Sequence, residues 1–361
     1  MWILGCITVT LTAAIGLAFM SEQPKCQKKP LCEKSGGGPA EKSFFTNSLH
    51  YTGEGMRYWY EEPNGLMSIT NTPYNQLSCK SCHVESCDRC HAKEDENRFS
   101  YSIEKAKDTD ICLTCHARAK ATFERGKEQG TLDVHIASGM SCADCHKGSD
   151  VHGDGTLRRS MRDDGAVIAS CTNCHKPKEN EIRPHKVHRD KLACAACHVS
   201  NSMSCLNCHM ENFIETGTKK GNFLPPVQDW MLLVNYKGKI TSGSVQTAVY
   251  KDKKFIAYAP YFTHSVQAKA KQCTDCHGNE AMQLLQKGQA VPMAEFKDGQ
   301  MVSWKGVVPL VPEKLKWSFL TKDGDKWVPI DNNEPPKVQF VNYAEPLTEA
   351  QIKKMAMPFK K

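Results

Sequence analysis

The stretch CTNCHKPKENEIRPHKVHRDKLACAACHVSNSMSCLNCH, residues 171–209, contains the pattern Cys-x-x-Cys-His three times. The whole chain contains the pattern eight times, between residues 79 and 277. Its sixteen cysteines are Cys79, Cys82, Cys87, Cys90, Cys112, Cys115, Cys142, Cys145, Cys171, Cys174, Cys194, Cys197, Cys205, Cys208, Cys273 and Cys276. Its eight histidines are His83, His91, His116, His146, His175, His198, His209 and His277. A repeat this frequent imposes the same local chemistry at many points of the chain.

Cys-x-x-Cys-His is the attachment signature of c-type haem. The two thiols form thioethers to the porphyrin, and the histidine ligates the iron from one side. Zinc ribbons also use Cys-x-x-Cys, but they need no histidine after each second cysteine. A disulfide framework does not need that histidine either. The sequence therefore predicts eight covalently bound haems c, held by the sixteen cysteines and with the eight motif histidines as proximal ligands.

The composition agrees with a fold built around cofactors. Only 8% of the 361 residues are aromatic, and the mean hydropathy is -0.51. Porphyrins supply the apolar surface that the side chains lack. The gaps between the first seven motifs are 3, 20, 25, 24, 18 and 6 residues, and each long gap has room for one or two short helices. We therefore predict a mostly α or irregular fold, with short helices and loops around a chain of haems and a smaller β-containing C-terminal part.

The net charge of +7 does not indicate a nucleic-acid surface. Two propionates on each of eight haems, offset by the ferric irons, bring the oxidised holoprotein to roughly −1. The expected partners are instead redox proteins, such as a quinol-oxidising cytochrome or a terminal reductase. Contact with a membrane is expected only through residues 2–20, and only if they are not cleaved.

Four regions follow from the composition. Residues 1–20 are apolar and predict an export signal or an N-terminal anchor; export agrees with haem attachment outside the cytoplasm, so a periplasmic or otherwise exported protein is expected. Residues 21–42 form a linker with Cys26 and Cys32, expected to be a local disulfide. Residues 43–210 form a seven-haem region. Residues 211–361 form a β-containing region that carries the eighth haem and a C-terminal helix.

Inside the last region, three short strands are expected at Met231–Tyr236, Ser244–Tyr250 and Lys254–Tyr258. A hairpin is expected from Lys316–Leu320 and Lys326–Ile330. The final helix should start at Thr348, with Gln351 completing a capping box. Ahead of the first motif, aromatic rings are expected to pack on the first haem pair: Phe44, Phe45, Tyr51, Tyr58, Trp59, Tyr60 and Tyr74.

Counting axial ligands gives a sharper prediction. The histidines outside the motifs, which are the candidate distal ligands, are His50, His135, His152, His185, His188 and His264. Six residues cannot serve eight irons, so at least two haems need Met, Lys, the chain amine, water or nothing in the sixth position. The nearby methionines that could ligate or simply fill gaps are Met140, Met203 and Met210.

The motif density resembles that of the multihaem cytochromes c. The run from His185 to His188 ahead of Cys194 also resembles the His-x-x-His segment of class III cytochromes c, which implies that these two histidines are distal ligands of different haems. The ligand deficit leaves a relation to the octahaem oxidoreductases of nitrite, hydroxylamine, tetrathionate or sulfite open. Two functions follow: an electron carrier of anaerobic respiration with closely packed, mainly bis-histidine haems, which we favour, or an octahaem oxidoreductase with one open or unusually ligated haem and unknown catalytic residues.

Overall fold

The computed structural model describes residues 44–78, 83–95, 98–176, 182–217, 227, 229–261, 264–324 and 326–358. Helices account for 37% and strands for 26% of the structure. The expected combination of short helices with a β-containing C-terminal part is present, but the description "mostly α" does not hold. The reason is the C-terminal sheet, which is larger than the sequence patterns indicated.

The described residues between 49 and 216 form mostly one- or two-turn helices, together with one hairpin and the strand β3 (Cys205–His209) of the main sheet. The helices are α2 (Leu49–Thr52), α3 (Glu54–Glu61), α4 (Met67–Thr70), α5 (Asp88–His91), α6 (Ile103–Ala106), α7 (Thr109–Leu113), α8 (Ala117–Gln129), α9 (Val134–Ala137), α10 (Cys142–Cys145), α11 (Gly148–His152), α12 (Arg183–His188), α13 (Cys194–His198) and α14 (Met210–Thr216), with short 3-10 turns at Tyr74–Gln76 and Cys171–Asn173. The hairpin pairs β1 (Ala92–Asp95) with β2 (Arg98–Tyr101). Side-chain caps from Ser48, Asp108 and Asp133 start three of these helices, which stabilises turns too short to persist alone.

A six-stranded sheet forms the main protein core. Its strands are β3 (Cys205–His209), β4 (Trp230–Tyr236), β5 (Lys239–Tyr250), β6 (Lys253–Pro260), β9 (Gly306–Pro309) and β13 (Lys337–Phe340), in the order β13-β6-β5-β4-β9 with β3 also on β5. Leu232, Val234 and Tyr258 are fully buried. The near-continuous apolar run of β4 fits a strand that is covered on both faces. The three strands expected here are confirmed, although β5 begins earlier than predicted.

The remaining C-terminal elements partly match the expectations. A second sheet has the order β10-β7-β8, from Leu315–Trp317, Val291–Lys297 and Gln300–Ser303. The hairpin pairs β11 (Leu320–Asp323) with β12 (Lys326–Pro329), so its first arm was predicted wrongly, because Leu315–Trp317 pairs with β7 instead. The capping box of Thr348 and Gln351 is confirmed, and it starts α17 (Glu349–Ala356). Helices α15 (Cys273–Cys276) and α16 (Glu280–Gln286) precede β7.

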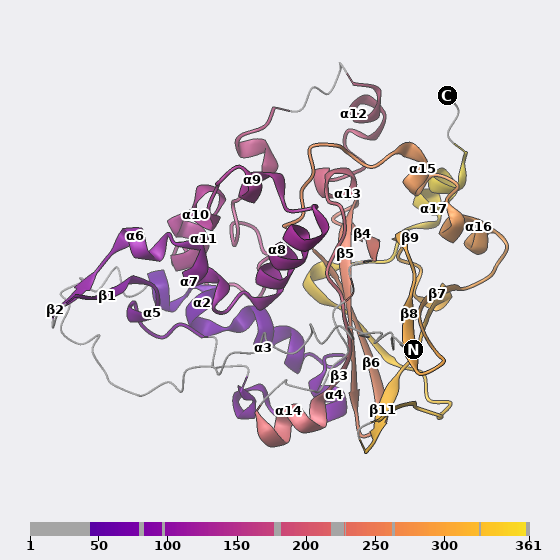
Figure 1. Ribbon diagram of the computed structural model, residues 1–361, viewed down its shortest axis with the longest axis horizontal. Helices are drawn as coiled ribbons and strands as arrows, with labels where there is room; N and C mark the ends of the chain where they lie inside the picture. Colours follow the sequence, from indigo (N-terminus) through magenta and orange to yellow (C-terminus); the bar gives the residue numbers. More distant parts are fainter. Residues whose placement is uncertain are drawn as a thin grey trace, which may run out of the picture. The chain divides into compact units, whose positions relative to one another are not determined.

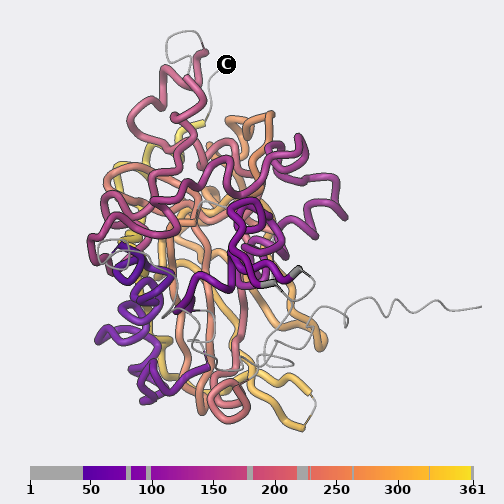
Figure 2. Tube along the Cα trace, turned by 90° about the vertical axis from the view of Figure 1, so that its left-hand side faces the viewer, coloured from indigo at the N-terminus to yellow at the C-terminus, as the bar shows by residue number. Residues whose placement is uncertain are grey.

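Figures 1 and 2 show that the helical segment from α2 to α11 covers one face of the main sheet. Residues 36–361 belong to one unit. The export signal or anchor, the linker with its disulfide and the first motif's cysteines, Cys79 and Cys82, lie outside the described residues. No helix among the residues described is long and apolar enough to cross a membrane. The division at residue 210 stays a prediction.

Candidate functional site

Each of the six histidines outside the motifs faces one motif histidine. We number the sites one to eight in the chain order of the motifs. The distances between ring centres are 6.0 Å for His91 and His152 at site two, 6.0 Å for His116 and His50 at site three, 6.3 Å for His146 and His264 at site four, 5.9 Å for His175 and His135 at site five, 6.3 Å for His198 and His185 at site six, and 6.1 Å for His277 and His188 at site eight.

These separations fit two ligands on opposite sides of one metal ion. Two metal–nitrogen bonds of about 2.0 Å and two ring radii of about 1.2 Å place the ring centres about 6.4 Å apart. No hydrogen bond joins the two rings of any of these pairs, all of which lie in the described part of the chain. The six pairs therefore have the spacing that a bis-histidine haem requires.

In five of the six pairs, one of the two rings forms a hydrogen bond to the protein through its Nδ1 atom. The contacts are His50 to the Val151 carbonyl at 3.1 Å, His188 to the Pro184 carbonyl at 3.0 Å, His198 to the Gln267 carbonyl at 3.4 Å, His135 to the Asp133 carboxylate at 3.1 Å, and His146 to the Asp150 carboxylate at 3.1 Å. A proton on Nδ1 leaves the lone pair on Nε2, the nitrogen that ligates a metal in this arrangement. These contacts thus fix both the tautomer and the direction of each ring.

The two carboxylates, Asp133 and Asp150, are buried. In each, the oxygen that does not contact the histidine ring accepts a backbone N–H. Asp133 accepts the amide of Val266 at 2.8 Å and caps α9 through the amide of His135 at 2.9 Å. Asp150 accepts the amide of Ile168 at 2.9 Å. Their side chains are 5% and 2% exposed. A buried carboxylate behind a histidine makes the ring a stronger electron donor, so sites four and five differ electronically from the carbonyl-backed sites.

Burial keeps several of these rings uncharged. It is the main cause that lowers the pKa of His50 and of His264, and the neighbouring His116 and His146 lower them further. The same effect of burial lowers the pKa of His152 and of His188. A neutral imidazole is the form that binds a metal, so the environment already favours the ligating state.

The motifs of the paired sites share one local conformation. Their cysteines lie on short helical turns, where the backbone N–H of the motif histidine donates to the carbonyl of the first cysteine at 2.8 to 3.0 Å, as at His91, His116, His146, His175 and His277. Residues three and four apart lie on the same side of a helical turn. Both cysteines and the histidine of a motif therefore lie on the same side of the turn, as attachment to one porphyrin requires.

Sites one and seven are different. The Nε2 atom of His83 lies 3.1 Å from the hydroxyl of Tyr74, and the two rings are stacked with their centres 5.8 Å apart. The Nε2 atom of His209 lies 2.9 Å from the carbonyl of Leu320, and Trp327 packs at 5.1 Å. At both sites the ring nitrogen that would ligate iron contacts a protein group instead.

The seventh motif also departs in backbone conformation. Cys205–His209 is strand β3, with Asn207 in the left-handed region at φ 56°. The amide side chain of Asn207 exchanges two hydrogen bonds with the backbone of Leu320, at 3.0 and 2.8 Å. In this conformation Cys205, Cys208 and His209 do not fit a haem as the six paired sites do. The sequence does not predict this difference, since residues 205–209 match Cys-x-x-Cys-His fully.

The other sequence candidates serve packing. Met203 and Met210 are 2% and 4% exposed, and Met210 belongs to an apolar cluster with Phe213 and Phe255. Tyr74 lies 5.8 Å from Tyr60 in the same cluster, so its ring is part of a core as well as a neighbour of His83. Sequence reasoning placed Tyr74 among rings that pack on haem but missed its polar contact with a motif histidine.

Comparisons with known proteins point to multihaem cytochromes. The family described as "Cytochrome c7 and related cytochrome c" matches residues 128–199, which include the Cys-x-x-Cys-His motifs of sites four, five and six. The chain is thus similar to the multihaem c-type cytochromes, and covalently bound haem c is the cofactor this similarity supports.

Three curated relatives match parts of the chain. The dissimilatory sulfite reductase MccA of Wolinella succinogenes is 25% identical over 38% of this chain, the cytochrome c-type protein NrfB of Escherichia coli 27% over 30%, and the multiheme cytochrome MtrA of Shewanella baltica 21% over 45%. The matches span 24%, 60% and 51% of those proteins. No solved structure gives a significant match.

Proposed function

We propose that the chain is an octahaem c-type cytochrome that carries electrons outside the cytoplasm in anaerobic respiration. The observation that carries this proposal is the set of six histidine pairs, which uses every histidine outside the motifs once. Haem c, when bound, supplies a one-electron redox centre at each site. Closing both axial positions with histidine favours electron transfer over binding of small molecules.

In this proposal the distal ligands are His152, His50, His264, His135, His185 and His188 for sites two, three, four, five, six and eight. The motif sequence supports haem attachment at sites one and seven. At site seven, attachment requires β3 to leave its present pairing and His209 to release Leu320. The partners would be redox proteins that exchange electrons with exposed cofactor edges through small transient contacts.

The experiment is a count of ligation states. Electron paramagnetic resonance and near-infrared magnetic circular dichroism of the oxidised protein should show six bis-histidine haems and no more. Eight bis-histidine signatures would contradict the pairing. The haem count itself follows from the mass of the intact protein, which rises by a fixed step for each attached porphyrin.

A second function is an octahaem oxidoreductase, and one observation favours site one as its centre. The hydroxyl of Tyr74 lies beside His83, where no histidine occupies the opposite side. A phenol can donate a proton or a hydrogen bond to a small oxyanion. The sulfite reductase named above is a relative over only 24% of its own length. Turnover of nitrite, hydroxylamine, sulfite or tetrathionate with a reduced viologen would support this function, and its absence for all four would exclude it.

A further inference from the structure

We propose that sites two, three, four, five, six and eight form one continuous electron path in that order, with site seven beside it as a side branch at site three. The proposal rests on the electron-transfer function above. It adds the order of the sites in space, which the order of motifs along the chain does not determine. Each step of the path is argued from a contact between two consecutive sites.

Sites two and three share a hydrogen bond. The Nδ1 atom of His50 at site three contacts the carbonyl of Val151 at 3.1 Å, and Val151 is bonded to His152, the distal residue of site two. The thiols of Cys90 at site two and Cys115 at site three also lie close enough for their charges to interact. Both the distal and the attachment sides of these two sites are therefore adjacent.

Sites three and four meet at their cysteines. The thiols of Cys112 and Cys142 lie close enough to interact with each other. The amide of Cys142 also donates to the Thr109 hydroxyl at 3.4 Å, which ties α10 to α7. Because each sulfur is the attachment point of a cofactor, this proximity places the attachment points of two neighbouring cofactors side by side.

Site four continues to site five through Asp133. One oxygen of this carboxylate contacts His135 of site five, and the other accepts the amide of Val266, two residues after His264 of site four. Sites five and six repeat the proximity of sulfurs, because the thiols of Cys171 and Cys194 lie close enough to interact with each other.

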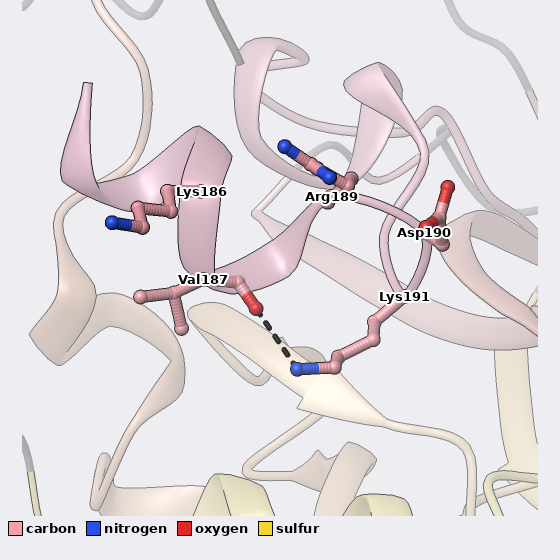
Figure 3. Close-up of a pocket in the computed structure, with 5 residues that line it drawn as sticks. All are labelled: Lys186, Val187, Arg189, Asp190 and Lys191. Atoms are coloured by element: carbon pink, nitrogen blue, oxygen red, sulfur yellow. Dashed lines mark hydrogen bonds between the residues drawn. The ribbon is translucent and has the colours of Figure 1, made fainter. Parts of the chain in front are cut away.

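Site six continues directly to site eight. Helix α12 carries both distal residues, His185 and His188, which face different motif histidines. Figure 3 shows the surface pocket beside this helix, where Lys186 and Val187 belong to the lining and the Lys191 ammonium donates to the Val187 carbonyl at 3.0 Å.

The attachment sides of sites six and eight are also neighbours. The amide of Lys271, two residues before the eighth motif, donates to the Cys197 carbonyl at 2.9 Å. The thiols of Cys197 and Cys276 are also close enough to interact electrostatically. The path therefore continues from site six to site eight and does not pass through site seven.

Site seven joins the path from the side. The Arg118 guanidinium donates to the sulfur of Cys205 at 3.6 Å, and Arg118 follows His116 of site three by two residues. The His209 ring points to the hairpin of β11 and β12, away from the other histidines, through its contact with Leu320. Removal of site seven should therefore leave the path intact, whereas removal of an internal site should interrupt it.

The test injects electrons at one end and detects them at the other. A ruthenium photosensitiser on Lys354→Cys sits near site eight, since the neighbouring Met355 carbonyl accepts the amide of Gly278 at 3.2 Å. His152→Met at site two gives a spectroscopically distinct, higher-potential acceptor. Flash photolysis of the full holoprotein then records the arrival of the electron at site two.

Two further substitutions discriminate the order. In the Cys142→Ala/Cys145→Ala variant, arrival should slow by orders of magnitude, because site four is missing from the path. In the matched Cys205→Ala/Cys208→Ala variant, which also lacks one motif, arrival should be as fast as in the parent. Intact mass confirms that all other haems are attached in each variant.

If the site-four variant does not fold, Cys171→Ala/Cys174→Ala interrupts the path at site five and has the same expected result. Unchanged arrival after the loss of an internal site would overturn the proposed order while leaving electron transfer in place. Equal slowing after the loss of site seven would also overturn it. No arrival in the parent protein would contradict both the path and the electron-transfer function.

Discussion

Replacing Asp133 by Asn should raise the reduction potential of site five. The Asp133 carboxylate lies 3.1 Å from Nδ1 of His135 and is buried. Its negative charge stabilises the oxidised, more positive state of the site. Hydrogen bonds to charged groups are worth about 1.5–3 kcal/mol, against about 0.5–1.5 kcal/mol for neutral ones. A difference of about 1.4 kcal/mol corresponds to about 60 mV for a one-electron couple.

Asn removes the charge and keeps more of the local structure than Ala does. Its single amide oxygen can still cap α9 at the position of the oxygen that contacts His135, but its NH2 group then replaces the oxygen that accepts the Val266 amide. Ala would lose the cap, at a cost of about 1 kcal/mol. It would also leave the Val266 amide without its partner, at about 1–3 kcal/mol. Asp133→Ala should therefore lower the free energy of unfolding more than Asp133→Asn does, because Asn keeps the cap, and both should change the potential of site five.

The assay is a spectroelectrochemical titration followed by electron paramagnetic resonance, which resolves individual haems. Asp150→Asn is the matched variant at site four, since Asp150 holds His146 in the same way. Asp154→Asn is the control, because Asp154 pairs with Arg158 at the surface and contacts no histidine in the described structure. The reasoning is refuted if Asp133→Asn moves the potential no further than Asp154→Asn does, or lowers it.

Three further outcomes are expected. His152→Ala should convert one haem from low to high spin, because site two loses its sixth ligand, and a spectrum without a new high-spin signal would contradict the pairing. Leu232→Ala should lower the free energy of unfolding by about 2–5 kcal/mol in denaturant titrations, since the side chain is fully buried, and a loss below about 1 kcal/mol would be inconsistent with that burial. Intact mass should fall by one haem in Cys205→Ala/Cys208→Ala; an unchanged mass would show that site seven carries none.

Local patterns predicted the sheet and the last helix because the forces that form them are local. The apolar run of β4 and the capping box of Thr348 and Gln351 need only neighbouring residues. The arm expected at Lys316–Leu320 failed because Leu315–Trp317 pairs with a distant strand, β7. A strand's partner depends on tertiary packing, which a short stretch of sequence does not encode.

The histidine pairs illustrate the same limit at the candidate site. The sequence predicted that six histidines would be shared among eight irons, which is a matter of counting. It could not predict that His50 faces His116 or that His146 faces His264, because these partners are far apart in the chain. The fold of the intervening segments decides those pairings, and only the pair of His185 and His198 is close enough in sequence to suggest itself.

The two motif histidines that face no other histidine, His83 and His209, differ from the paired ones in which ring nitrogen the protein contacts. At the paired sites, every ring–protein hydrogen bond described above uses Nδ1 and leaves Nε2 toward the partner ring. At His83 and His209 the contact uses Nε2 itself. Tyr74 offers a hydroxyl that can equally serve a bound molecule, whereas the Leu320 carbonyl at His209 also accepts the side-chain amide of Asn207. An unusual ligand or a substrate is therefore better sought at site one, which adjoins the path through the hydrogen bond from the Val84 amide to the His50 carbonyl at 3.0 Å.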